Sequence, residues 1–231
     1  MKLLLSILVC TSSMFAQNYI FNSVISNSNI GDSTNIKGKG SGKIVTKNIT
    51  LKKSFNAINI NTAGDISIHN SSKNKVSIQT DKNLINKCST YIENGILFIK
   101  TKDNFISSDG LKIDIDSSNL KKLTIVGASN VKVKDYNIDN LTLNIDGSSD
   151  LYLNSNSINR LNIKADGSYD INLLNSKVKE ATIRASGSGD IKIDVSNSLN
   201  VYIDGTTDIK YRGNPKISKE INGVADLIKI K

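Results

Sequence analysis

The chain carries Gly147-Ser-Ser-Asp150-Leu-Tyr-Leu153 and repeats this phrase as Gly167-Ser-Tyr-Asp170-Ile-Asn-Leu173, Gly187-Ser-Gly-Asp190-Ile-Lys-Ile193 and Gly205-Thr-Thr-Asp208-Ile-Lys-Tyr211. An earlier copy stands at Gly127-Ala-Ser-Asn130-Val-Lys-Val133, and a weaker one follows at Gly223-Val-Ala-Asp226-Leu227. The first glycines of successive copies lie 20 residues apart, and the last ones 18. A fixed period near twenty indicates one small structural unit repeated along the chain. The second half therefore predicts an architecture more clearly than an activity.

Apolar residues alternate with polar ones on both sides of each glycine. Before Gly167 they stand at Leu161, Ile163 and Ala165, and after it at Ile171 and Leu173. This period of two is typical of strands with one face turned inward. Another apolar position follows eleven residues after several of the glycines, so each unit offers three short inward-facing segments.

From this pattern we predict an all-β fold, specifically a single-chain parallel β-helix with rungs of about 20 residues and atypical strands at its N-terminal end. Successive rungs of such a solenoid would lie about 4.8 Å apart and stack equivalent side chains. The alternative is a series of antiparallel hairpins, with each Gly-Ser-Ser-Asp as a hairpin turn. Equivalent positions match in size, which favours the solenoid.

The repeated glycine and the acidic residue three positions later have a structural interpretation and a functional one. Glycine permits a backbone angle that other residues resist, and Asp or Asn can accept backbone N–H groups to close a corner. The functional alternative is a metal-binding column of carboxylates. Calcium requires six to eight oxygen ligands, and no calcium-loop motif surrounds these positions. We therefore expect no metal, cofactor-binding or catalytic residues.

The N-terminus predicts export. Met1-Lys2 precedes a short apolar run that ends at Val9, and Ala16 offers a small residue for cleavage, so residues 1–16 read as a signal peptide. The run is too short to span a membrane, and we expect no transmembrane segment after its removal. A lipid anchor at Cys10 is disfavoured, because Val9 stands where lipoprotein processing requires a small residue. The expected location is the periplasm, the outer membrane or the cell surface.

We expect residues 17–37 to be a polar leader or an extra strand, and residues 38–231 to form one domain. The glycine cluster at 38–42 lacks the Gly-Lys-Ser/Thr of a phosphate loop. Strand-like runs follow it, and 63–68 reads as a degenerate copy of the repeat. Atypical terminal units are common in repeat proteins because they must cover the end of the core.

Composition argues against several functional classes. The formal charge is +9, but the lysines are dispersed, unlike the basic stripe of a nucleic-acid-binding protein. His69 is the only histidine, and it lies on a strand-like run without a nearby cysteine or the sharp turn that presents a nucleophilic serine. A His-based triad is therefore unsupported. A carbohydrate-cleaving enzyme needs only two carboxylates, but the aspartates recur at one position without the local exception that marks an active site.

We therefore expect a non-enzymatic exported protein that acts as an adhesin-like binding module. A structural or self-assembling envelope scaffold is the first alternative, and a carbohydrate-active enzyme is the second. The outward positions, which we take to include Tyr152, Tyr169 and Tyr202, suit glycans or envelope and host surface proteins as partners. The oligomeric state is left open by the sequence.

The chain also resembles a known family. The glycine cluster, Phe55-Asn-Ala-Ile58, the repeated Gly-Ser-Ser/Gly-Asp units and the ending Asp208-Ile-Lys-Tyr211-Arg-Gly213-Asn-Pro215 are similar to the putative auto-transporter adhesin, head GIN domain family. The resemblance runs from about residue 38 to the C-terminus. It implies an exported, all-β protein of bacterial envelopes with a role in adhesion and no established catalytic residues. The repeat departs from the family pattern at Gly205 and Gly223, where serine is replaced.

Overall fold

The computed structural model describes residues 36–231, which form one compact unit. The predicted signal peptide at 1–16 and nearly all of the predicted leader at 17–37 lie outside the described residues. The described chain is all-β apart from a single turn of 3-10 helix, η1 (Ile85–Lys87). No helix in this part of the chain is long and apolar enough to cross a membrane.

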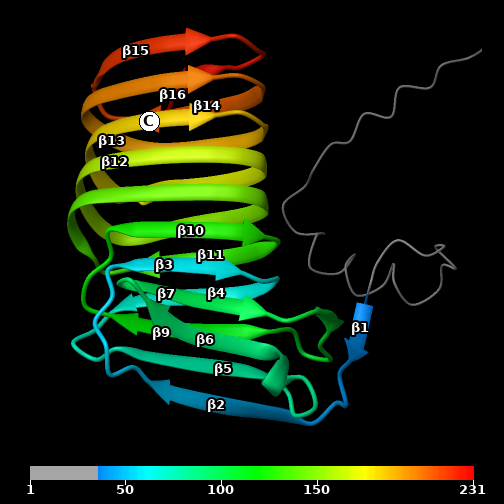
Figure 1. The fold of residues 1–231 in the computed structure, drawn as a ribbon. Coiled ribbons are helices and arrows are strands. Elements are labelled where there is room, and N and C mark those ends of the chain that lie inside the picture. The colour runs from blue at the N-terminus through cyan, green and yellow to red at the C-terminus, as the bar shows by residue number, and fades with distance from the viewer. Residues whose placement is uncertain (1–35) are drawn as a thin grey trace, which may run out of the picture. The chain divides into compact units, whose positions relative to one another are not determined.

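The strands form a small two-stranded sheet of β1 and β8 and a 14-stranded sheet that contains all the others (Figure 1). Those of the first half are β1 (Ile36–Lys39), β2 (Ile44–Thr50), β3 (Ala57–Asn61), β4 (Gly64–Asn70), β5 (Lys75–Asp81), β6 (Cys88–Glu93), β7 (Ile96–Thr101), β8 (Asn104–Ile106) and β9 (Lys112–Ser117). Those of the second half are β10 (Lys122–Gly127), β11 (Ser129–Lys134), β12 (Asn137–Ala185), β13 (Ser188–Ile203), β14 (Thr206–Arg212), β15 (Lys216–Ile221) and β16 (Leu227–Lys229).

In the second half, successive units pair in parallel and in register. Leu123 of β10 lies beside Leu143 of β12, and Gly127 beside Gly147. The step of 20 residues gives the chain enough length to return to the same end before the next parallel strand begins. We call the strands before each glycine the leading strands and those after it the trailing strands. Both kinds turn alternate apolar side chains into one continuous core.

The prediction of a single-chain parallel β-helix over residues 38–231 is wrong. The large sheet is mixed and curls into a half-barrel, with antiparallel pairs β2–β5, β5–β9 and β6–β7 at its N-terminal end. One cause is Asn94-Gly95, where both residues have positive φ, 50° and 74°. Asn-Gly in this conformation makes the tight hairpin turn that joins antiparallel strands. The alternative of antiparallel hairpins at each Gly-Ser-Ser-Asp is also wrong, because those units pair in parallel.

The strand order at the N-terminal end also departs from chain order. β3 lies between β7 and β10, and β4 lies between β9 and β11, so residues 57–70 pack directly against residues 122–134. The degenerate copy at 63–68 therefore continues the repeat in space. Asp65 aligns with Asn130, whereas Gly64 aligns with Ser129 and not with Gly127.

The repeated glycines stand where neighbouring units approach most closely. Gly147 and Gly167 have φ of 121° and 98°, a region that disfavours other residues. A Cβ on Gly167 would collide with the carbonyl oxygen of Gly147 in the adjacent unit. Two separate constraints therefore select glycine at this corner.

Candidate functional site

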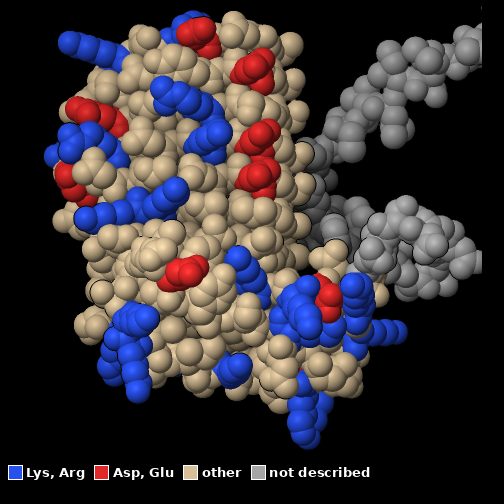
Figure 2. All heavy atoms as spheres, in the orientation of Figure 1, with Lys and Arg blue, Asp and Glu red and all other residues tan. Residues whose placement is uncertain are grey.

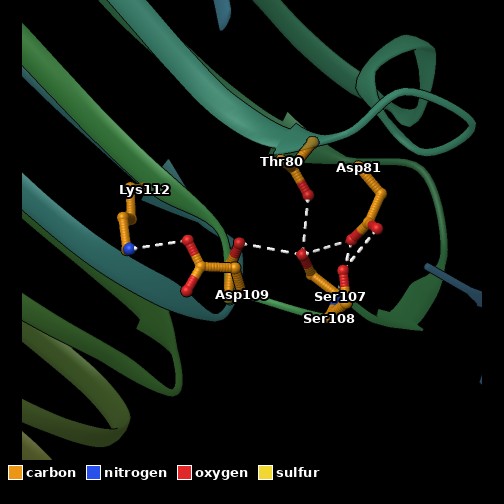
Figure 3. Close-up of polar contacts among 7 residues, drawn as sticks. Thr80, Asp81, Ser107, Ser108, Asp109 and Lys112 are labelled. Carbon is orange, nitrogen blue, oxygen red and sulfur yellow. Dashed lines mark hydrogen bonds and ion pairs between the residues drawn. The ribbon is translucent and has the colours of Figure 1, made fainter. Parts of the chain in front are cut away.

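Asp81 lies at the centre of the densest polar cluster in the described chain. Its side chain is fully enclosed at the end of β5. One carboxylate oxygen accepts the hydroxyl of Ser108 at 2.5 Å and the backbone N–H of Gly42 at 2.7 Å. The other accepts the hydroxyl of Ser107 at 2.7 Å and the backbone N–H of Ser108 at 2.8 Å. Figure 3 shows the cluster, with Thr80 donating to Ser107 beside it.

These hydrogen bonds, first among them that from the Ser108 hydroxyl, hold the pKa of Asp81 far below its ordinary value. Both oxygens are occupied and the side chain has no open side toward solvent. The arrangement therefore suits a clamp and not a general base. It ties the 38–42 glycine segment and the 107–110 loop to β5.

The residues that could support nucleophilic chemistry lie apart from one another. His69 stands on β4 with its Nε2 4.0 Å from Oδ1 of Asp114. Cys88 is a free, buried thiol at the start of β6, and burial raises its pKa to about 11. A protonated thiol inside the core is a poor nucleophile.

Two columns of polar side chains face inward at the corners, and each bonds to backbone groups of the neighbouring unit. The side-chain Oδ1 of Asn156 accepts the backbone N–H of Tyr136 at 2.9 Å, and the Ser176 hydroxyl accepts the backbone N–H of Asn156 at 3.3 Å. At the glycine corner, the Ser129 hydroxyl donates to the carbonyl oxygen of Thr62 at 2.7 Å, and that of Ser149 donates to Gly127 at 3.1 Å. These contacts satisfy backbone groups where the strands turn, so they are structural.

Tyr169 belongs to the glycine-corner column, and the prediction that it faces outward is wrong. Its ring is buried, and its hydroxyl lies 2.6 Å from that of Thr207, two units along. The ring crosses the intermediate unit at Gly189, where a Cβ would collide with it. In the sequence, glycine at position 189 could have indicated that the equivalent residue of the preceding unit, Tyr169, extends inward over it.

The repeated aspartates line up on the outer side of the trailing strands. Asp170 aligns with Asp190, and Asp190 with Asp208. Burial, together with the neighbouring carboxylates, raises the pKa of Asp150 and of Asp170. In residues 36–231 the only backbone N–H that this column accepts is that of Asp226, which donates to Asp208 at 3.0 Å. The expected role in closing each corner is therefore wrong for most of these residues.

The column does not form an evident cation site either. Among the described residues, no group of three or more His, Cys, Asp or Glu side chains is arranged to hold a metal ion. Oδ1 of Asp170 is enclosed without a hydrogen-bond partner. At the start of the column, the Nδ2 of Asn130 donates to Asp65 at 3.0 Å and relieves the same kind of crowding.

The outer side of the leading strands, which we call the leading face, is the strongest candidate for binding. Side chains of neighbouring strands align along it in columns, at the strand spacing of about 4.8 Å. The central column begins at an aromatic stack and ends at the last leading strand. Within β12 the contacts of Gly147 with Gly167 and of Gly167 with Gly187 continue the 20-residue step. Successive members are Tyr91, Phe98, Asn59, Thr124, Asn144, Lys164, Arg184, Tyr202 and Glu220. Figure 2 shows this face, with basic side chains beside an acidic column over the C-terminal units.

Aromatic rings with a cation over them stand at the start of the central column and at its last position but one. The rings of Tyr91 and Phe98 stack with centroids 5.0 Å apart, and the Lys100 ammonium lies 4.9 Å from the Phe98 centroid. At the other end, the Arg184 guanidinium lies 4.7 Å from the Tyr202 centroid. Such cation–π pairs orient the cation and the ring together at an exposed site.

A shallow hollow of about 190 Å³ lies beside Arg184 and Tyr202. Its lining residues are Lys164, Arg184, Ala185, Ser186, Tyr202, Ile203, Asp204, Glu220 and Asn222. Pockets that enclose small-molecule ligands usually measure about 300–1,000 Å³. The hollow can therefore hold part of a ligand that extends beyond it.

Comparison with solved structures confirms the general fold. The chain is similar to a crystal structure of a putative adhesin from Bacteroides fragilis, with 22% identity, a TM-score of 0.69 and coverage of 83% of this chain and 99% of that one. It is also similar to a structure from Parabacteroides distasonis described as a putative lipid binding protein, with 21% identity, a TM-score of 0.61 and coverage of 84% and 100%.

A putative adhesin from Parabacteroides merdae is similar at 21% identity with a TM-score of 0.51, and the match covers 84% of this chain and 98% of that one. No protein with a curated description matches the chain in sequence. The family model for the putative auto-transporter adhesin, head GIN domain matches residues 54–215, which include every clear copy of the repeat. The chain therefore belongs to the putative auto-transporter adhesin, head GIN domain family.

Proposed function

We propose that this protein is a non-enzymatic, exported adhesin-like module that binds extended partners through its leading face. The observation that carries the proposal is the contrast between the two kinds of polar group. The enclosed ones, such as Asp81 and Asn156, are engaged by the protein itself. The outer column of the leading face instead presents exposed side chains such as Lys164 and Arg184, which are free to contact a partner.

Membership in a family of adhesin heads supports a binding role, and adhesion requires an extracytoplasmic location. The partners that suit a long polar face are glycans or surface proteins of the envelope or of a host. One structural relative is described as a putative lipid binding protein. The hollow on the leading face, at about 190 Å³, is too small to enclose an acyl chain.

The scaffold alternative depends on the C-terminal edge of the sheet. Within the described chain β15 pairs only with β13, and β16 only with β14, so each has one unpaired edge. Exposed Ile217 and Val224 lie there too. However, Lys219 aligns with buried Val201, so a charged and exposed residue takes an inward-facing position of this edge strand. Inward charges on edge strands oppose further strand addition, and we therefore favour a binding role over self-assembly.

A matched pair of charge reversals tests the proposal. Lys164 lies on the leading face and Lys132 on the trailing face, and both are exposed. We expect the wild type to be retained on at least one member of a panel of immobilised polysaccharides and envelope proteins, without releasing new sugar ends. Lys164→Glu should change this retention, and Lys132→Glu should leave it nearly unchanged. Equal effects of both variants, or cleavage of a polysaccharide, would overturn the proposal.

A further inference from the structure

The three arginines of the chain differ in what they contact. Arg160 donates from Nε to Asn140 at 2.7 Å and forms an ion pair with Asp139 at 3.4 Å. Arg212 pairs with Asp194 at 3.4 Å and also donates to the carbonyl oxygen of Leu174. Among the described residues Arg184 has neither an ion pair nor a side-chain hydrogen bond, and its contact is the Tyr202 ring. Its five N–H donors remain available at an exposed position.

The Tyr202 ring positions Arg184 although its donors are free. The guanidinium lies over the ring, and this cation–π contact favours one placement, so an anion would meet donors that are already oriented. Lys164 precedes it by one unit in the same column and adds a second cation without an ion pair in residues 36–231. A guanidinium with free, oriented donors recognises a carboxylate in a bidentate manner.

Hydrogen-bond acceptors also line the hollow. Asp204, Asn222 and Glu220 belong to its lining, together with the small residue Ser186. The residue before each of the four central repeat glycines forms an acidic column on this face. Its members are Asp146, Asp166, Ser186 and Asp204, so a serine replaces the carboxylate at the hollow. Carboxylate and amide groups beside an aromatic ring suit a polyhydroxylated ring that bears its own acid group.

We infer that the Arg184–Tyr202 hollow is a subsite for a carboxylate-bearing sugar within an acidic polysaccharide, an inference that rests on the proposed binding role of the leading face. Arg184 binds the carboxylate of the sugar, and Tyr202 contacts the apolar edge of the sugar ring. Asp204 and Asn222 accept hydrogen bonds from the hydroxyl groups of the sugar. Neighbouring sugars continue along the column, because one sugar advances a polymer by about the spacing between strands. The formal charge of +9 attracts such a polyanion at long range.

The test compares a polyuronate with the same polymer after chemical reduction of its carboxylates, using the mature chain and titration calorimetry. We expect the polyuronate to bind and the reduced polymer to bind at least tenfold more weakly. Arg184→Gln should lower the affinity for the polyuronate by about tenfold to a hundredfold, as expected for loss of a charge-assisted contact. Arg160→Gln makes the same chemical change at an arginine that is already paired and should leave the affinity within about twofold.

The outcomes separate this inference from the proposed function. If the wild type binds both polymers equally and Lys164→Glu binds neither, the acidic-sugar inference is overturned, while the leading face still stands as a binding surface. Binding of single-stranded DNA as tightly as the polyuronate would also overturn it, because the contact would then be general to polyanions. If Tyr202→Leu binds like the wild type, the ring contact is wrong. Absence of polyuronate binding by a folded wild type would overturn the inference alone.

Discussion

The C-terminal units and the N-terminal strands share one core but are joined in different ways. Between residues 122 and 212, each strand lies beside its own equivalent, as Ile191 lies beside Ile209. Between residues 44 and 117, strands fold back, and Tyr91 faces Phe98 across a hairpin. Stacking by register dominates the first region, and the enclosed Asp81 cluster holds loops together in the second. The comparison shows that a repeat period in the sequence predicts which strands pair only where the segments that connect the strands repeat as well.

The largest expected effect tests whether the two regions unfold together. Ile183 in the C-terminal units and Ile78 in the N-terminal strands are both fully buried. Replacing either with alanine should cost about 2–5 kcal/mol through lost burial and a cavity. Denaturant unfolding followed by circular dichroism should show one transition in both variants, since the core is continuous. Thr182→Ala, one residue from Ile183 on the outer side, should change stability by less than about 0.5 kcal/mol. Two separate transitions would contradict a shared core.

The next effect concerns the clamp in the N-terminal region. Asp81→Asn should destabilise the protein at neutral pH, because the amide nitrogen would face hydroxyl and N–H donors. The pKa of Asp81 is lowered in the folded state. Its contribution to stability is therefore present above the ordinary carboxyl pKa of about 3.9 and is lost as the pH falls below that value. Urea midpoints of wild type and variant should converge below pH 4. A constant difference down to pH 2 would show that Asp81 is not the titrating group.

A smaller effect is expected from the buried hydroxyl pair of the C-terminal units. Tyr169→Phe removes the partner of the Thr207 hydroxyl and should cost about 0.5–1.5 kcal/mol, or somewhat more if that hydroxyl stays unpaired. Tyr152→Phe, at a partly exposed position on the trailing side, is the control and should be nearly neutral. Equal unfolding free energies for the two variants would show that the Tyr169 contact contributes nothing.

The smallest effect has the opposite sign to that at Asp81. Burial raises the pKa of Asp170, so its carboxylate lowers stability at neutral pH, and this cost disappears as the pH falls through the raised pKa. Asp170→Asn should therefore stabilise the protein at pH 7 by less than about 1 kcal/mol, since the side chain is only partly buried and solvent screens the remaining charge. Asn130 already makes such a contact with Asp65. A loss of stability in Asp170→Asn at pH 7 would contradict this account.

The sequence predicted the all-β class, the inward face of each strand and the glycine corners, because these follow from local alternation and a repeated backbone demand. It did not predict the mixed sheet, although Asn94-Gly95 is a recognisable hairpin turn that interrupts the parallel order. The order that places β3 beside β10 rests on contacts between segments more than 60 residues apart, which no local pattern encodes.

The candidate site could be predicted only in part. Tyr202 and the outward position of Lys164 follow from alternation along the strand. The free state of Arg184 does not, because all three arginines look alike in sequence and the difference lies in whether a carboxylate of another unit reaches them. Tyr169 was misplaced because serine at the equivalent position of the preceding unit, Ser149, gives no sign of how far a larger side chain extends inward.

The contact of Tyr169 with Thr207 also affects how the C-terminal units would respond to a pulling force. Arg212 and Leu174 make a second contact over the same separation of 38 residues, so two links bypass the intermediate unit. A tensile load applied at the C-terminal side would peel the sheet from its unpaired edge. These links tie residues 205–212 to the unit of residues 167–174, across the unit of residues 187–193 that lies between them. Detaching residues 205–212 therefore breaks these links as well as the strand pairing, so we expect two units to detach together and not one strand at a time.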